Sequence, residues 1–181
     1  MITPKEELEI AQLFDLRGLT EPFLGKDRDT NAIRKLHLNS LWILKTPYFG
    51  HASDLIAAVV HTREWNRGLM LIRNRNGETY PENPKVLDIG NWDDPVISAL
   101  DSINLIYNDS SVSLNDPVSY DMLVSTRNIL AQLMIDYGNS IEDQSLNQLW
   151  IALKSAVHSL VELYGDSKMH DYVHFGAQED S

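Results

Sequence analysis

SDLIAAVVHTREWNRGLMLIRNRNG, residues 53–77, changes its pattern near the middle, at Gly68. It opens on a serine, a residue type that caps helices, so 54–66 is predicted to be helical, although its β-branched residues lower the helix propensity. After the glycine, Leu69–Arg73 is typical of a strand, and Asn76-Gly77 is the dipeptide favoured in tight hairpin turns. The stretch therefore predicts a helix followed by a β-hairpin.

Helices are also expected on the N-terminal side of this stretch. Thr3-Pro4-Lys5-Glu6 is a capping box with proline at the first helical position, and it predicts a helix that ends at Gly18. A second helix is predicted from Asp29 or Thr30 to about Leu44, ended by Pro47. The buried stripe of the first helix is expected to consist of Leu8, Ala11, Phe14 and Leu16.

On the C-terminal side, residues 78–80 are expected to complete the hairpin, and 85–89 to add a short strand. Apolar residues at helical spacing then predict helices over 95–107, 117–138 and 140–165. The last two are joined by only a few residues, which predicts an antiparallel helical hairpin.

The expected fold class is mainly α with a minor β component. An N-terminal helical group is followed by one inserted β-hairpin or small sheet and by a C-terminal antiparallel helical bundle. Residues 1–90 form the charge-neutral helical segment with the hairpin, 91–165 an acidic helical bundle packed on it, and 166–181 a polar tail. A length of 181 residues favours one domain overall.

The composition is that of a globular protein, with 43% hydrophobic and 23% charged residues. There is no cysteine, which excludes disulfides, thiolate metal sites and a cysteine nucleophile and suits the reducing cytoplasm. The N-terminus lacks the pattern of a secretory signal. The most apolar segment, 41–60, is interrupted by lysine, proline, glycine and aspartate, so no membrane span is expected.

Charge is distributed unevenly along the chain. Residues 1–90 carry 12 acidic and 12 basic residues, whereas 91–181 carry 14 acidic and three basic residues, so the whole net charge of −11 lies in the second half. Such asymmetry favours an acidic surface that selects a partner protein with a basic groove, although acidic faces also serve solubility alone. Binding on the acidic side is assigned to Asp136, Glu142 and Asp143.

A basic cluster with a tryptophan lies in the first half. Its members are Arg63, Trp65, Arg67, Arg73 and Arg75, opposed only by Glu64. Arginine and tryptophan dominate binding hot spots, so the cluster is a candidate surface for an acidic protein groove or a phosphate backbone. Alternatively, Trp65 anchors the hairpin and the arginines pair with the acidic half of the same chain.

The order of the predicted elements around this cluster is that of a winged helix. In that interpretation 54–66 is the recognition helix and 74–77 the tip of the wing. The segment between the preceding helix and this one is longer than a helix-turn-helix allows, and the half carries no net positive charge, so nucleic acid is the less favoured partner.

The histidines offer one metal-like pattern. His170-Asp-Tyr-Val-His174 has the i, i+4 spacing of zinc ligands on a helix, but it lies in the polar tail and has aspartate where metalloproteases have glutamate, so no metal is expected. His37 is expected to be a core histidine and His158 to pair with Glu162. His51-Ala-Ser53 is explained by the serine as a helix cap.

No nucleophile elbow, phosphate loop or dinucleotide fingerprint occurs in the sequence. We therefore expect a non-enzymatic interaction protein without a cofactor, regulatory or inhibitory, that binds a partner protein through an acidic helical face. A DNA-binding regulator with an acidic dimerisation half is the second hypothesis, and an enzyme with dispersed site residues the third. A two-fold homodimer is also predicted, because Ile151 lies off the apolar stripe of its helix.

Overall fold

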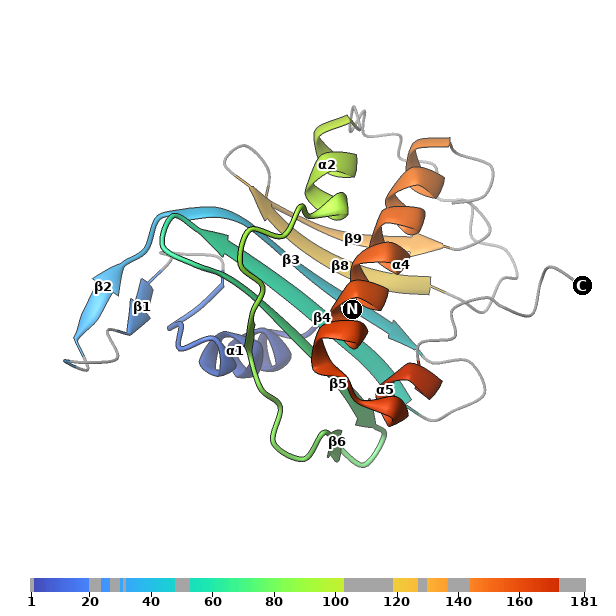
Figure 1. Ribbon diagram of the computed structural model, residues 1–181, viewed down its shortest axis with the longest axis horizontal. Helices are drawn as coiled ribbons and strands as arrows, with labels where there is room; N and C mark the ends of the chain where they lie inside the picture. The colour runs from blue at the N-terminus through green and yellow to red at the C-terminus, as the bar shows by residue number, and fades with distance from the viewer. Residues whose placement is uncertain are drawn as a thin grey trace, which may run out of the picture. The chain divides into compact units, whose positions relative to one another are not determined.

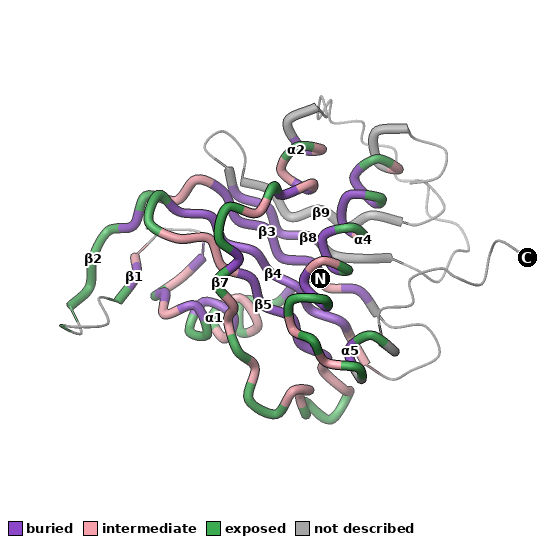
Figure 2. The backbone as a smooth tube through the Cα atoms, viewed as in Figure 1, coloured by how far each residue is buried: buried purple, intermediate pink, exposed green. Residues whose placement is uncertain are grey.

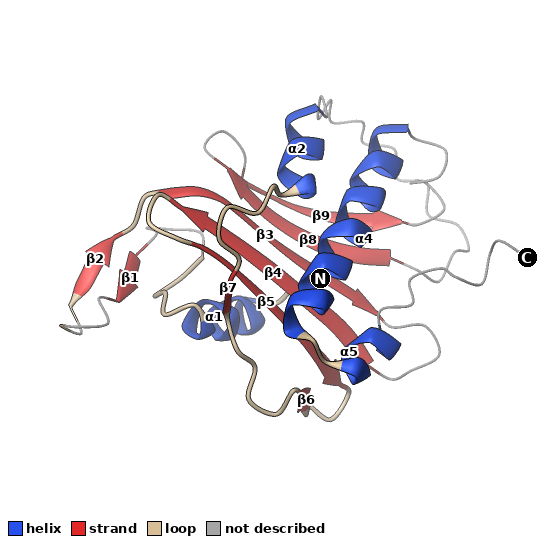
Figure 3. Ribbon diagram, in the orientation of Figure 1, coloured by secondary structure: helices blue, strands red, loops and turns tan. Residues whose placement is uncertain are grey.

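The structure of the protein, a computed structural model, describes residues 2–19, 24–26, 30, 32–47, 53–102, 119–126, 130–136 and 144–172. It shows an α+β fold in which an antiparallel sheet dominates (Figures 1 and 3). The chain forms two compact units: Met1–Trp92 with Asp121–Met134, and Asp93–Tyr120 with Ile135–Ser181. The expected mainly α fold with a helical bundle is wrong.

The main sheet has the strand order β6-β5-β4-β3-β8-β9, and β7 pairs with β5 as well. Its strands are β3 (Leu38–Pro47), β4 (Ser53–Thr62), β5 (Asn66–Asn74), β6 (Thr79–Tyr80), β7 (Leu87–Asp88), β8 (Ser119–Thr126) and β9 (Leu130–Asp136). The centre of the sheet is antiparallel, with Val59 opposite Trp42 on one side and opposite Gly68 on the other. A separate ribbon pairs β1 (Leu24–Lys26) with β2 (Ile33–Lys35).

The predicted helix over 54–66 is the central strand β4, and Ser53 begins that strand rather than capping a helix. Every residue from Leu55 to Thr62 is buried. A strand buried on both faces is continuously apolar and rich in β-branched residues, so it lacks the alternation that marks a half-exposed strand. Figure 2 shows that the middle of β3 and of β5 is buried as well.

Two further predicted helices are also strands. The segment from residue 30 to Leu44 contains β2 and most of β3, and 117–138 contains β8 and β9, so the predicted helical hairpin does not exist. Apolar residues in these segments occur at spacings that fit a helix, but each segment finds its hydrogen-bond partners in a neighbouring strand. His37, expected in the core, is exposed between β2 and β3.

The first helix confirms its capping box. In α1 (Pro4–Leu13), the Thr3 hydroxyl accepts from the Glu6 amide at 3.3 Å, and the Glu6 carboxylate accepts from the Thr3 amide at 2.8 Å. The helix packs across one face of the sheet (Figure 1). Its buried stripe is centred on Ile10, which turns the predicted member Leu8 outward. The core on this face contains Ile10, Ala11, Phe14, Leu16, Leu41, Ile43, Ile56, Ala58, Val60, Leu69 and Leu71.

The hairpin after Gly68 is confirmed, with β5, β6 and β7 close to their predicted positions. Gly77 has a φ of 85°, the left-handed conformation that its turn requires and that glycine adopts without strain. The backbone amide of Asn74 donates to the Glu78 carbonyl at 2.9 Å and closes the turn.

The second unit contains α2 (Pro95–Ser102), α4 (Gln144–Tyr164) and α5 (Ser167–Tyr172), and α2 and α4 pack on each other. Asp94 caps α2, as its Oδ1 accepts from the Val96 amide at 2.9 Å. The last long helix is confirmed, and it ends at Gly165 with a φ of 63°. Its buried stripe contains Leu149, Trp150, Leu153, Val157, Leu160 and Val161.

Ile151 lies off this stripe as expected, with 54% of its surface exposed, and self-association stays a prediction. Within the predicted polar tail, Ser167–Tyr172 form α5, whose Met169 is buried. None of the helices that the structure describes combines the length and the apolar composition of a membrane span.

Candidate functional site

The turn between β4 and β5 is held by the side chain of Thr62. Its hydroxyl accepts from the amides of Glu64 (3.1 Å) and Trp65 (2.9 Å) and donates to the Trp65 carbonyl (2.8 Å). The Arg63 amide also donates to the His37 carbonyl at 3.1 Å, which ties the turn to the start of β3. A hydroxyl that satisfies several backbone groups fixes a short loop, so the side chains of this turn are presented by a rigid backbone.

Trp65 is half-buried and packs against the core beneath α1. The guanidinium of Arg67, at the start of β5, lies 4.3 Å from the centre of its ring. Such a cation–π contact fixes the orientation of a guanidinium. Arg63 is exposed on the turn beside this stack.

The ribbon of β1 and β2 is attached to the end of α1. The amide of Arg17 donates to the Leu24 carbonyl and that of Lys26 to the Asp15 carbonyl, both at 2.9 Å. Gly25 lies between Leu16 and Arg34, and a Cβ at this position would approach Leu36 Cδ1 to 2.5 Å, so a larger residue would have to displace the Leu36 side chain. Figure 1 shows the ribbon at the same end of the sheet as the turn after β4.

A small pocket lies where the ribbon, the end of α1 and the turn meet. It encloses about 40 Å³, room for a few water molecules or one small polar group. Its rim carries three cations and one carboxylate. The residues that line it are Phe14, Asp15, Leu16, Gly25, Lys26, Arg34, Leu36, Trp65 and Arg67.

We call this end of the first unit the basic end. It is defined by Arg17, Lys26, Arg34, Lys35, Arg63, Trp65 and Arg67. At the basic end, Arg34 forms an ion pair with Glu64 at 2.7 Å. The remaining charges of Arg17, Lys26, Lys35 and Arg63 are exposed to solvent.

Arg73 and Arg75, predicted to belong with Arg63 and Arg67, lie elsewhere. β5 separates Arg67 from Arg73 by six residues, about 20 Å at 3.3 Å per residue. Arg73 pairs with Glu9 at 2.9 Å and lies 3.8 Å from Glu6, so it binds α1 to the sheet, and Arg75 is exposed at the hairpin turn. The predicted cluster therefore divides into a candidate binding surface and a structural ion pair.

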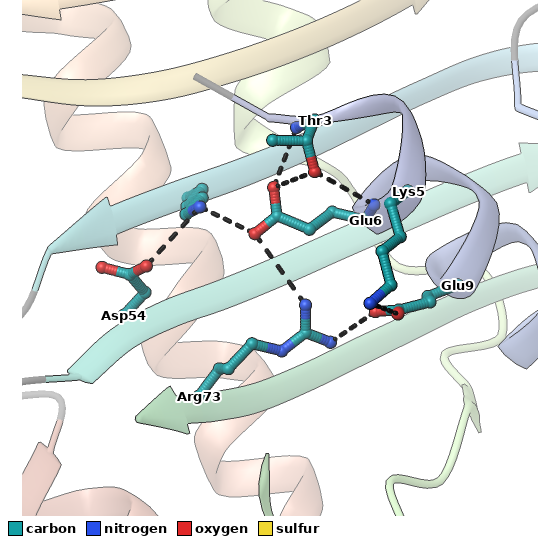
Figure 4. A network of polar contacts seen from close by, with 7 residues as sticks. Thr3, Lys5, Glu6, Glu9, Asp54 and Arg73 are labelled. Atoms are coloured by element: carbon teal, nitrogen blue, oxygen red, sulfur yellow. Dashed lines mark hydrogen bonds and ion pairs between the residues drawn. The ribbon is translucent and has the colours of Figure 1, made fainter. Parts of the chain in front are cut away.

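The structural ion pair belongs to a network under α1, shown in Figure 4. Lys45 Nζ lies 2.7 Å from Glu6 Oε1 and 3.5 Å from Asp54 Oδ2. Burial alone would raise the pKa of Glu6, but hydrogen bonds from Lys45 and Thr3 and the charge of Lys45 outweigh it and lower this pKa to about 2. Burial alone would lower the pKa of Lys45, but the hydrogen bonds and charges of Glu6 and Asp54 outweigh it and raise this pKa. Both groups are therefore charged at neutral pH.

The other predicted site residues are not brought together. Asp136 is in β9, and Glu142, Asp143 and His174 lie outside the described residues. His170 is exposed on α5. Among the residues that the structure describes, no group of three His, Asp or Glu side chains is placed to hold a metal ion.

Sequence reasoning missed Arg34 because residues 30–44 are predicted to form a helix, and it missed Lys26 and the pocket because the ribbon is not predicted. Two signals were present. Gly25 directly follows the apolar pair Phe23-Leu24, and a glycine beside such a pattern indicates close backbone approach. Thr62, three residues before Trp65 and between two apolar runs, has the position of a hydroxyl that stabilises a turn.

No family model matches the chain, and neither a curated protein nor a solved structure is significantly similar to it. Its function is inferred from the fold and the basic end alone.

Proposed function

We propose that this chain is a non-enzymatic interaction protein, regulatory or inhibitory, that binds an acidic segment of a partner protein through the basic end. The observation that carries the proposal is the stack of Arg67 on Trp65 beside Arg34 and the exposed Arg63, on a turn held by three hydrogen bonds of Thr62. Rigid arginine and tryptophan side chains that do not reorganise on binding are typical of interaction hot spots. The absence of cysteine favours action in the cytoplasm.

An acidic protein segment fits better than nucleic acid. The protein carries a net charge of −11. In a long polyanion such as duplex DNA, only a few phosphates would contact the basic end, and the net negative charge of the protein would repel the others. A short acidic segment meets only the local field, since charges more than about 8 Å apart are screened at physiological ionic strength. The winged-helix interpretation also loses its recognition helix, because residues 53–62 are the buried strand β4.

The proposal is tested with a fluorescein-labelled oligoglutamate peptide and a labelled random-sequence DNA duplex, each titrated with the protein in fluorescence anisotropy. The peptide is expected to bind with an affinity that falls as salt rises, and the duplex to bind more weakly at physiological salt. Tighter binding of the duplex would favour a nucleic-acid function instead. No binding of either probe would contradict the proposal.

The charge distribution supports a second binding surface, since residues 91–181 hold the entire net negative charge. Its three assigned residues do not form a helical face, because Asp136 is in β9. We propose that this acidic half attracts a basic groove on a partner protein.

Neutralising Asp136, Glu142 and Asp143 together, as D136N, E142Q and D143N, should slow association with a labelled oligolysine peptide and make the rate less sensitive to salt. Stopped-flow fluorescence measures the rate, and circular dichroism checks that the fold is kept. The matched control neutralises Glu7, Glu78 and Glu82 in the first half and should have a smaller effect. Equal rates for both triple variants would mean that the acidic half serves solubility alone.

A further inference from the structure

Arg34, one of the cations that line the pocket, already forms an ion pair with a carboxylate of the protein itself. Arg34 Nη1 lies 2.7 Å from Glu64 Oε2, and each side chain keeps about 40% of its surface exposed. Arg34 lines the pocket and comes from the ribbon, and Glu64 comes from the turn after β4, so the pair joins these two segments beside the pocket. Solvent-exposed ion pairs contribute little to stability, so this pair can open at small cost.

The surroundings of the pair favour a carboxylate at this position. Lys26 and Arg67 line the same pocket, so with Arg34 three cations face one carboxylate, Asp15, and Arg67 is oriented by its stack on Trp65. The buried side chains of Phe14, Leu16 and Leu36 also line the pocket. A small group with a charged head therefore meets both cationic donors and apolar side chains, the combination that orients a ligand in a concave site.

We propose that the pocket beside Trp65 receives a glutamate or aspartate side chain of the partner's acidic segment, and that Glu64 is its internal competitor. The incoming carboxylate takes Arg34 from Glu64, and Glu64 returns to Arg34 when the partner leaves. This inference rests on the proposed function, because it names the group that the basic end recognises. A tethered competitor acts at a high effective concentration, so Glu64 sets a threshold that an isolated free carboxylate does not overcome.

The variant Glu64→Gln removes the competing charge and leaves the shape of the side chain. Its affinity for the labelled oligoglutamate peptide is expected to rise about threefold to tenfold. The matched control is Glu78→Gln, which makes the same change of charge on the exposed turn at the opposite end of β5, where Glu78 accepts from Asn74 Nδ2 at 2.6 Å. This control should leave the affinity within about twofold, since its distance from the basic end exceeds the screening length.

The variant Arg34→Gln tests the other partner of the pair. It should weaken peptide binding about tenfold, and adding Glu64→Gln to it should restore little, because the group for which the two carboxylates compete is gone. In ¹⁵N nuclear magnetic resonance spectra, the indole N–H signal of Trp65 should shift with saturation by the peptide. A labelled phosphoserine peptide serves as the alternative probe for the same pocket.

The outcomes separate the two levels of the proposal. Equal gains for Glu64→Gln and Glu78→Gln would mean that only overall charge matters, which overturns the pocket inference and keeps the proposed function. A loss of affinity in Glu64→Gln would show that the ion pair holds the site together, and it also overturns the inference. A gain from Glu64→Gln that is specific to the phosphoserine peptide would replace the carboxylate by a phosphate. Failure of every variant to bind any acidic peptide would contradict the proposed function itself.

Discussion

Replacing Lys45 with methionine is expected to lower the free energy of unfolding by about 3 kcal/mol, because it leaves a buried carboxylate without its main partner. Lys45 and Glu6 keep only 18% and 13% of their side-chain surface exposed, and their atoms lie 2.7 Å apart. Arg73, 3.8 Å from Glu6, offsets part of the loss. Urea denaturation followed by circular dichroism measures the change.

The matched control is Lys5→Met, the same substitution in the neighbouring pair with Glu9. Lys5 is 88% exposed and lies 3.9 Å from its partner, so the loss should stay below about 1 kcal/mol. The double variant Lys45→Met with Glu6→Met should recover much of the stability, since well-packed apolar side chains replace a buried ion pair at little cost. A double variant as unstable as Lys45→Met would show that the network matters for more than its charge balance.

The same network predicts a specific response to acid. The pKa of Glu6 is lowered to about 2 from an ordinary value of 4.5, so its stabilising effect is fully present above pH 4.5 and is lost as the pH falls toward 2. The loss for this group alone is about 3 kcal/mol, from 1.36 kcal/mol per unit of pKa. Lys45→Met should show a shallower fall of stability over this range than the unmodified protein, because Glu6 then lacks its strongest donor.

The second large effect is expected in binding. Reversing two exposed charges of the basic end, in the double variant Arg63→Glu with Lys35→Glu, should weaken the oligoglutamate peptide about 30-fold or more. Both side chains are exposed and form no ion pair within the described residues, so the fold should tolerate the change. Fluorescence anisotropy gives the affinity and thermal melting the stability.

The control for this variant reverses two exposed charges at the opposite end of β5, Arg75→Glu with Lys5→Glu. The change in net charge is identical, so a difference between the two double variants reports position. An equal loss in both would mean that the peptide senses the whole molecule and that the basic end is not a site.

The candidate site was accessible from the sequence only in part. The cluster of Arg63, Trp65 and Arg67 was visible because its members are neighbours along the chain. Arg34 and Lys26 belong to the site because the ribbon pairs with the end of α1. Arg73 does not belong to it, because Arg73 forms an ion pair with Glu9 of α1. Contacts between residues distant in the chain decide which arginines share a surface.

The sequence alone determined those elements whose hydrogen bonds close locally. The capping box of Thr3 and Glu6, the stripe of α4 with its glycine stop, and the turn at Asn76-Gly77 each depend on residues within one or two turns of chain, and all three are present in the structure. Side-chain period and cap chemistry carry that information directly.

Only the tertiary structure decided that residues 53–62, and those of β3, β8 and β9, are strands. β4 pairs along its length with β3 and β5, and β3 pairs with β8 more than 75 residues away, with Ser40 opposite Thr126. A segment buried on both faces shows no alternation, so its local pattern fits a buried helix as well as a strand. The segment forms a strand because neighbouring strands supply the hydrogen-bond partners of its amides and carbonyls. Those strands are in place only once the chain has folded.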